Sequence, residues 1–571
     1  MLNKIVTNVT RIRSLFSNGN GRTTAAFAFG RSVVLTSVVV TGVLVGLRQI
    51  GTMEGLELGA YDQLVRSHPD QGPDNRLLVV GVTETDIQTR QEYPIKDDTL
   101  AQLLEKLQQY QPRTIGVDIL RDVPQGSPQG RIALENILKQ NDSIIAGCKL
   151  SSADQPGIAA APGVTEERVG FADLPLDPGG TLRRSLLLSI PTTPKTPPPI
   201  QHICNIPDPN NQLPSFSFQL ALLYLEAQNI QPEQTKTGEI KLGSTVFKRL
   251  GGQSGGYHQA DVADYRLMLR YRSPKNAVKQ VSLTEVLDGK VDPALVKDRI
   301  VLIGYTAPIV KDDFYTPYSA GLQDNQKMPG VVIQAQNVSQ ILSAVLDNRP
   351  LIWYWPEGSE ILWIWGWSLV GAILGWRIRR LWLFGLGVVA AVGVLYGTCY
   401  VIFSSSGWVP LVPPALALAI AAGTVVLVDR GYAKAIYQGV KKVILNIEID
   451  EEKKQQQIAE ITETESFAEL EKKAEELRNR RRRDKLSENV VESETEVEEA
   501  TQVPQEAEPT EEDDYFQQLQ KRGKQLRNTQ RETTPTPQDS QSIEESQEED
   551  YFEQLQKRGK KLRNTEDESN T

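Results

Sequence analysis

Residues 77–86 read LLVVGVTETD, an apolar run that stops at a polar turn. A short apolar run bounded by turn residues predicts a strand that is buried on both faces. Similar runs follow it along the chain. They are RTIGVDI at 113–119, SIIAGC at 143–148, SLLLSI at 185–190, YRLMLRY at 265–271 and RIVLIGY at 299–305. The sequence therefore predicts a sheet whose strands are far apart in the chain.

Helical patterns separate several of these strands. The segment 98–110 begins with an aspartate cap and then repeats leucine at helical spacing, and segments 215–227 and 331–345 behave similarly. Strands that alternate with helices predict an α/β domain with a mixed or parallel sheet and flanking helices. We place this domain at residues 52–350.

Acidic residues follow several of the predicted strands. In α/β sheets, ligands bind beyond the carboxyl ends of the strands. The candidate ligand-binding residues at this edge are Asp86, Asp118, Asp312, Asp313 and Thr316. Together they would suit a cation or a cationic ligand. An aspartate after a strand also commonly caps a helix or a turn, so both roles remain open.

Other kinds of chemistry have few residues to carry them. The three histidines, His68, His202 and His258, are scattered, so neither a Ser-His-Asp triad nor a histidine metal site is predicted. GGQSGG at 251–256 lacks the strand-to-helix setting and the Lys-Ser/Thr of a phosphate-binding loop. The net charge of -10 is spread over segments of different character, without a basic domain. We therefore expect no catalytic residues, no metal, no cofactor and no nucleic-acid partner.

The chain contains three cysteines, Cys148, Cys204 and Cys399, without a CxxC pair. Cys148 and Cys204 both belong to the α/β domain. The charge pattern described below places this domain outside the cytoplasm, where a disulfide is permitted. Our prediction is nevertheless two separate buried thiols, because free cysteine is commonly a small buried apolar residue.

Four apolar segments have about the length of membrane spans. They occupy residues 32–51, 359–376, 381–403 and 408–428. The first is predicted to be an uncleaved anchor, with a signal peptide as the alternative. The spans hold no ionisable residue at bilayer depth, which argues against a transport pathway. The tryptophans all lie within or beside the last three segments, and many lie near span ends as membrane-interface residues do.

Charge predicts the direction of these spans. The basic N-terminus at 1–31 has no acidic residue, and RIRR at 377–380 joins the second and third spans. The uncharged SSSG at 404–407 joins the third and fourth. The positive-inside rule then places both termini in the cytoplasm and the α/β domain outside it. The membrane that the spans cross is predicted to be the plasma (inner) membrane. Pro413 and Pro414 predict a helix start or a kink in the last span.

Several blocks in a fixed order resemble a known family. They are YDQLVR at 61–66, LLVVGVTETD at 77–86, GFADLPLDPGGTLRRSLL at 170–187, RIVLIGYTAPIVKDDFYTPY at 299–318 and MPGVVIQAQNVSQIL at 328–342. Over residues 52–350 the chain is similar to the CHASE type-two domain, an extracellular sensory module of bacterial membrane receptors. The resemblance implies one span before the domain and three after it. DPGGTLRR at 177–184 stands in place of the family's DPDG-like turn followed by arginine. The acidic residue within the turn is lost, which argues against a charge role there, although Gly179 and Gly180 keep the turn geometry.

The C-terminal part lacks the kinase or cyclase that usually ends such receptors. Residues 429–483 are predicted to be a cytoplasmic helical segment, and residues 484–571 a disordered tail of low hydrophobicity and high charge. This part contains no histidine and no Gly-rich nucleotide loop. It does contain a repeat, since DDYFQQLQKRGKQLRNT at 513–529 recurs as EDYFEQLQKRGKKLRNT at 549–565.

Each repeat begins with acidic residues, continues with an apolar set and ends with basic residues. The candidate partner-binding residues are Tyr515, Phe516, Leu519, Leu526, Tyr551, Phe552, Leu555 and Leu562. Two copies would give avidity toward a cytoplasmic protein. An anionic lipid surface and a neutral duplication are the other interpretations.

These observations predict a membrane-anchored, sensor-like receptor rather than an enzyme. Its α/β domain would bind an unidentified ligand outside the cytoplasm, and its tail would recruit an unidentified cytoplasmic protein. Membrane lipid surrounds the spans in this prediction, and receptors of this plan often act as homodimers. The alternative is a scaffold protein whose outer domain holds a partner in the cell envelope.

Overall fold

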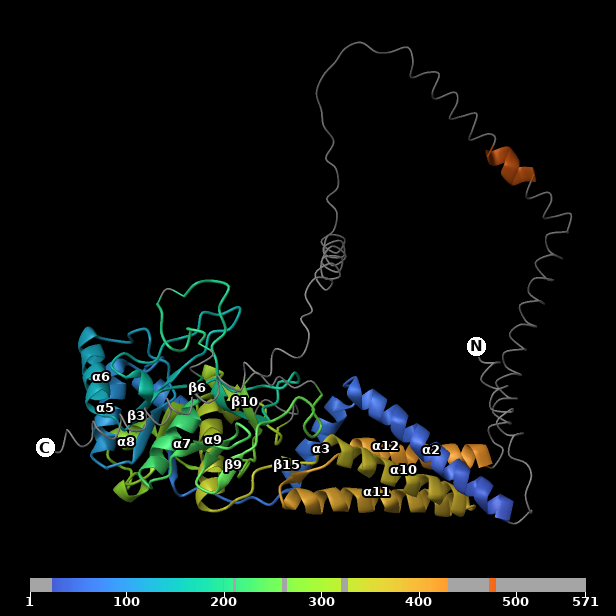
Figure 1. Ribbon diagram of the computed structural model, residues 1–571. Coiled ribbons are helices and arrows are strands. Elements are labelled where there is room, and N and C mark those ends of the chain that lie inside the picture. Colours follow the sequence, from blue (N-terminus) through green and yellow to red (C-terminus); the bar gives the residue numbers. More distant parts are fainter. Residues whose placement is uncertain are drawn as a thin grey trace, which may run out of the picture. The chain divides into compact units, whose positions relative to one another are not determined.

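A computed structural model describes residues 23–198, 200–208, 212–258, 264–319, 327–429 and 472–478 (Figure 1). Residues 472–478 form a short helix. Both tail repeats, the remainder of 430–571 and residues 1–22 lie outside the described residues, so the predictions made for them are not addressed by the structure.

The α/β domain is built on a six-stranded sheet in which every neighbouring pair is parallel. From one edge to the other, the strands are β11 (Lys279–Ser282), β1 (Leu77–Val82), β12 (Ile300–Tyr305), β2 (Thr114–Val117), β3 (Ile144–Cys148) and β4 (Val169–Phe171). The register aligns Leu78 with Val301 and Val301 with Ile115. The predicted α/β fold with a mixed or parallel sheet is thus confirmed, and the main sheet is parallel.

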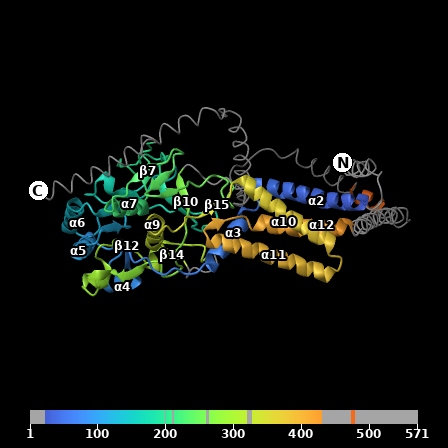
Figure 2. The same cartoon turned by 60° about the horizontal axis from the view of Figure 1, so that its bottom comes forward.

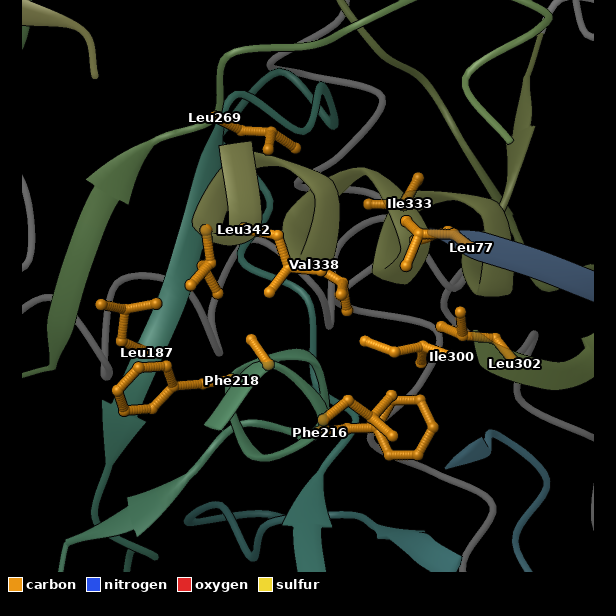
Figure 3. Packing of buried hydrophobic residues seen from close by; sticks show 14 of the residues in the cluster. Leu77, Leu187, Phe216, Phe218, Leu269, Ile300, Leu302, Ile333, Val338 and Leu342 are labelled. Atoms are coloured by element: carbon orange, nitrogen blue, oxygen red, sulfur yellow. The ribbon is translucent and has the colours of Figure 1, made fainter. Parts of the chain in front are cut away.

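Helices cover both faces of this sheet. One face carries α4 (Glu84–Arg90), α5 (Asp97–Gln108), α6 (Pro128–Gln140) and α8 (Leu283–Leu287), and the other carries α7 (Phe216–Glu226) and α9 (Gly330–Leu346). Alternate residues of β1 enter the two cores: Leu77 and Val79 pack with α7 and α9, whereas Leu78 and Val80 pack with α5. Figure 3 shows the core beneath α7 and α9, into which Leu77 points. Burial on both faces explains why these strands are apolar throughout.

The start of α5 differs from the prediction. Its N-cap is Lys96, which makes no side-chain cap hydrogen bond, and Asp97 and Asp98 lie in the first turn. The acidic residues are therefore placed where a helix dipole favours them rather than at the cap itself.

Smaller elements complete the domain. In one small sheet, β5 (Arg184–Ser189) pairs antiparallel with β10 (Tyr265–Met268) and with β6 (Leu213–Pro214). A second small sheet is an antiparallel meander of β7 (Pro232–Gln234), β8 (Ile240–Leu242) and β9 (Thr245–Phe247). A third consists of β13 (Asp313–Phe314) and β14 (Met328–Pro329), which pair antiparallel. Short 3-10 helices span Glu166–Arg168, Pro293–Leu295 and Pro308–Val310. The helix α3 (Glu54–Ser67) precedes β1.

The prediction of two separate buried thiols is wrong. Cys148, at the end of β3, and Cys204, in the loop between β5 and β6, form a disulfide. The bond lies in a buried apolar cluster with Phe171 and Leu213. The backbone N–H of Ser151 donates to the Cys204 carbonyl (2.8 Å), so this loop folds back beside the end of β3. Sequence spacing could not show this proximity because the two cysteines are 56 residues apart.

Four apolar helices lie side by side (Figures 1 and 2), namely α2 (Thr23–Gln49), α10 (Glu357–Arg377), α11 (Leu381–Ser404) and α12 (Val412–Asp429). By length and composition, Ser32–Gln49 and Leu381–Ser404 are each able to cross a membrane. A Cβ atom at Gly371 of α10 would lie 2.1 Å from the Leu418 carbonyl oxygen of α12. Glycine therefore allows the backbones of α10 and α12 to approach closely.

The last apolar helix begins later than predicted. α12 starts at Val412, with two prolines in its first turn, where the missing N–H groups are tolerated. The preceding residues form β16 (Gly407–Trp408), which pairs in parallel with β15 (Trp353–Tyr354). Trp408 is 1% exposed and packs against Tyr61. Aromatic residues of the α/β domain therefore bury it.

Candidate functional site

A cavity of about 500 Å³ opens beyond the carboxyl ends of several parallel strands. The residues that end or closely follow β12, β2, β3 and β4 line it, and they include Tyr305, Asp118, Lys149 and Asp173. This is the edge at which α/β sheets bind their ligands. We call this space the sheet-edge cavity.

Aromatic side chains form part of the wall of the sheet-edge cavity. Tyr93, from the loop after α4, meets Tyr305 edge to face, with ring centroids 6.1 Å apart, and Phe314 of β13 also lines the wall. The Tyr305 hydroxyl accepts a hydrogen bond from the backbone N–H of Ile95 (3.2 Å), which attaches the loop to β12. Such a wall suits the apolar part of a small organic ligand.

Two carboxyl groups line this cavity with no hydrogen-bond or ion-pair partner among the described residues. They belong to Asp118, which follows β2, and Asp312, which lies between β12 and β13. Burial, together with the charge of Asp312, raises the pKa of Asp118 well above its usual value. Burial and the neighbouring Asp313 raise the pKa of Asp312. The cationic residues of the lining, Arg121 and Lys149, contact Asp97 and Gln155 instead. Two neighbouring carboxyl groups that no described cation contacts favour binding of a proton or of a cationic group.

The first turn of α9 closes one side of the cavity. Gly330 donates its backbone N–H to the Asp312 carbonyl (2.9 Å), and a Cβ atom at this position would lie 2.8 Å from Asp312 Oδ2. Only glycine therefore lets the carboxyl group lie so close to the start of the helix. Gln334 of the same helix donates to the carbonyl of Ala172 (2.9 Å), just beyond β4. These contacts attach α9 to the strand edge.

Four charged or amide residues of this cavity, Arg121, Lys149, Asp173 and Gln334, are not among the residues predicted from the sequence. Asp173 Oδ2 accepts a hydrogen bond from the backbone N–H of Leu150 (2.8 Å), yet burial raises the pKa of Asp173. The rule that selected Asp118, a polar residue after a strand, would also have found Asp173 and Lys149. Gln334 lies on a helix, so no local signal connects it with the strand edge.

Asp86 does not line the sheet-edge cavity. It belongs to a capping box at the start of α4, where Oδ2 accepts from the Thr83 backbone N–H (2.8 Å). Its Oδ1 accepts from the Thr284 backbone N–H (3.0 Å), which joins α4 to α8. Burial would raise the pKa of Asp86, but the hydrogen bonds from Thr284 and Thr83 outweigh burial and lower it. This geometry is that of a helix cap.

Asp313 and Thr316 also lie outside the cavity lining. Asp313 Oδ1 is 3.8 Å from Lys327 Nζ, and the buried Thr316 hydroxyl accepts from the Tyr318 backbone N–H (3.3 Å) within a turn. In the part of the chain that the structure describes, no three His, Cys, Asp or Glu residues are grouped to hold a metal ion.

A second group of charged residues is buried where α3 meets the start of β5. Arg183 donates Nε and Nη2 to the two carboxylate oxygens of Asp62, and Nη1 to Asp177, each at 2.7 Å. Arg184 and the Tyr257 hydroxyl donate to Asp177 at 2.8 and 3.0 Å. Two guanidinium groups thus balance two carboxylates. The inference that the DPGGTLRR stretch has no charge role is wrong, because Asp177 and both arginines belong to this network.

The domain contacts the apolar helices beside this network. Trp408 packs against Tyr61 of α3, with ring centroids 4.8 Å apart. Glu57 of α3 accepts hydrogen bonds from the backbone N–H groups of Leu411 and Val412, both at 2.8 Å. Burial raises the pKa of Glu57, although these hydrogen bonds oppose the rise. The Glu57 carboxylate therefore caps α12 from another helix. We call Glu57, Tyr61 and Trp408 the joint.

Comparison with known proteins identifies one family. The family model of the CHASE2 domain matches residues 38–373, from within α2 to within α10. No curated protein and no solved structure matches the chain. The matched segment includes the sheet-edge cavity, the charged network, and Glu57 and Tyr61 of the joint.

Proposed function

This chain belongs to the CHASE2 domain family, an extracellular sensory domain family, and on this premise we propose that it is a membrane-anchored receptor for a small cationic ligand. The observation that carries the proposal is the pair of unpartnered carboxyl groups, Asp118 and Asp312, in a cavity with an aromatic wall. A ligand with an ammonium or amidinium group would supply the missing counter-charge. Its apolar part would pack against Tyr93, Tyr305 and Phe314.

Small organic amines are therefore expected to stabilise the full-length chain in lipid nanodiscs. At about 100 times the dissociation constant, the unfolding temperature should rise by about 5 °C. Asp118→Asn and Asp312→Asn should each reduce affinity at least about tenfold, because each removes one negative charge from the cavity. Glu105→Gln is the control and should bind as the wild type does, since it removes an exposed carboxylate that does not line the cavity.

The pH dependence supplies a second readout of the same prediction. The pKa of Asp118 is raised, so this carboxyl group becomes protonated at a higher pH than an exposed aspartate. Protons compete with a cationic ligand, and affinity should therefore fall as pH is lowered through this raised pKa. Equal affinity of wild type and both cavity variants at neutral pH would refute the proposed site.

We extend the proposal to a chain with four spans, formed by α2, α10, α11 and α12. Contacts between the helix ends support it. Arg48 near the end of α2 forms an ion pair with Glu360 near the start of α10. Trp353, before α10, donates its indole N–H to the Ser405 carbonyl after α11 (3.0 Å). Since Glu57 caps the start of α12, each of these four helices has one end at the α/β domain. The RIRR turn at 377–380 joins α10 to α11 at their other ends.

The joint is the proposed path from the ligand to the cytoplasm. Asp62 connects α3 to the start of β5, and Glu57 on the same helix caps α12. Any displacement of α3 within the domain would therefore act on the N-terminus of α12. In this proposal α12 leads into the cytoplasmic tail.

The proposed output is recruitment of a cytoplasmic protein by the two tail repeats at 513–529 and 549–565. Phe516→Ala combined with Phe552→Ala should remove the largest apolar contact of both copies, and recovery of the partner by the full-length chain should fall by about 10²-fold or more. Each single variant should retain part of the binding. The matched control combines Asn528→Ala with Asn564→Ala, outside the aromatic positions. Equal recovery by the phenylalanine and asparagine variants would exclude this mode of recruitment.

A further inference from the structure

A second cavity, of about 350 Å³, lies between β9, the end of α9 and the segment that leads into α10. Ser244, Thr245, Val246 and Lys248 line it, together with residues 348–354. Tyr354 lies three residues before Glu357, where α10 begins. The cavity is therefore at the end of the domain that joins the proposed spans, and we call it the membrane-proximal cavity.

The charged side chains that line the membrane-proximal cavity are positive. Arg349 and Lys248 line it, and its described lining includes no acidic residue. Lys248 Nζ lies 5.5 Å from the centroid of the Tyr354 ring, a cation–π contact that holds the ammonium at the wall. Arg270 donates Nη1 to the carbonyl of Pro350 (2.8 Å), which also lines the cavity. Positive charge is thus gathered at this place without a carboxylate in the lining.

Arg349 has hydrogen-bond donors that the protein leaves unused. Its Nη2 donates to the Tyr271 carbonyl (3.2 Å), whereas Nε and Nη1 are buried and reach no acceptor in the described part of the chain. Buried donors without an acceptor are costly, and a guanidinium group cannot avoid the cost by losing its charge. Burial, with the nearby Arg270 and Arg272, lowers the pKa of Arg349 to about 9. Tyr318 and Asp74 oppose this shift without cancelling it, so the positive charge around this guanidinium is only partly compensated.

We propose that the membrane-proximal cavity binds a phosphate group. The planar guanidinium of Arg349 presents donors in the arrangement that suits phosphate oxygens, and Lys248 adds a second cation. Ser244 lines the same cavity and offers a hydroxyl donor. Trp353, also in the lining and 40% exposed, has the amphipathic side chain found at membrane surfaces. The phosphate belongs either to the headgroup of an anionic phospholipid or to a free phosphate.

The test measures the unfolding temperature of the full-length chain in nanodiscs of two compositions. In phosphatidylcholine discs, inorganic phosphate is compared with sodium chloride at equal ionic strength. In a separate arm without inorganic phosphate, phosphatidylcholine discs, whose lipid has no net charge, are compared with discs that contain anionic phosphatidylglycerol. At saturation, a rise of about 5 °C is expected in at least one arm. A rise with inorganic phosphate identifies the free anion as sufficient, and a rise only with phosphatidylglycerol identifies the lipid headgroup.

Variants separate this site from general electrostatic attraction. Arg349→Gln and Lys248→Gln should each abolish most of the rise, whereas Arg349→Lys should keep part of it. Lys297→Gln removes an exposed lysine that does not line the cavity and should behave as the wild type. Absence of a rise in both arms, or an equal rise in Lys248→Gln and Lys297→Gln, would overturn the proposal even if Arg349→Gln fails to fold.

Discussion

Replacement of Arg183 by alanine is expected to lower the free energy of unfolding of the α/β domain by about 3–5 kcal/mol. Asp62 and Asp177 are 2% and 3% exposed, and both bind this guanidinium. Without Arg183, Asp62 loses two hydrogen bonds of 2.7 Å and remains a buried carboxylate. Arg184 still pairs with Asp177, so the loss falls mainly on Asp62. Calorimetry of the full-length chain in nanodiscs measures the change.

Two further variants test whether the network itself causes this loss. Arg183→Lys keeps the charge but cannot donate the two parallel hydrogen bonds, and it should destabilise the domain by an intermediate amount. Asp62→Asn combined with Arg183→Met removes both partners together. The double variant should lose less stability than the sum of the two single variants, because neither charge is left buried alone. Strictly additive losses would contradict the proposed pairing.

Trp408→Ala is expected to weaken the joint by about 3–5 kcal/mol, the usual cost of deleting a large buried aromatic side chain. A Cβ atom at Gly255 would lie 2.3 Å from the Trp408 ring, so the backbone itself forms part of the indole's pocket. Removing the ring would leave a void beside Tyr61 and loosen the start of α12. Hydrogen exchange at the Leu411 and Val412 amides should accelerate by about 10²-fold or more, while exchange in β12 stays unchanged.

The matched control for this variant is Trp382→Ala at the start of α11. Trp382 is 67% exposed and lies at the opposite end of that helix from the joint. Its loss should change exchange at Leu411 and Val412 by less than about threefold. Similar acceleration in both variants would mean that Trp408 has no special role in attaching α12 to the domain.

The secondary structure of the domain was largely predictable from local patterns. The run at 299–305 became β12 at Ile300–Tyr305, and the helix predicted at 331–345 became α9 at Gly330–Leu346. A strand that is covered on both faces must be apolar throughout, so a run of consecutive apolar residues shows its position in the sequence. The apolar pattern placed the start of the last helix too early, at residue 408, whereas Pro413 and Pro414 lie in its first turn and indicate the observed start. Trp408 is as apolar as a span residue, and only its contacts place it within the joint.

The candidate site was predictable only in part. A rule about polar residues after strands selected Asp118 and Asp312, which line the sheet-edge cavity, together with Asp86, which caps α4. The rule locates polar residues at one edge of the sheet. It does not show which of their carboxyl groups accept hydrogen bonds from neighbouring residues and which do not. Tyr93 and Gln334 come from a loop and a helix whose positions depend on the packed fold.

The local sequence pattern thus determined the α/β class of the domain and the separation of apolar helices from it, because burial on two faces and extended apolar helices are properties of neighbouring residues. It left open whether the sheet is mixed or parallel, which the pairing of the strands decided. The tertiary structure alone decided the contacts between distant residues. Arg183 meets Asp62 across 121 positions, Cys148 joins Cys204, and Glu57 caps a helix that begins at Val412. These pairings, and the carboxyl groups and guanidinium donors left without partners, depend on distances in space that sequence spacing does not encode.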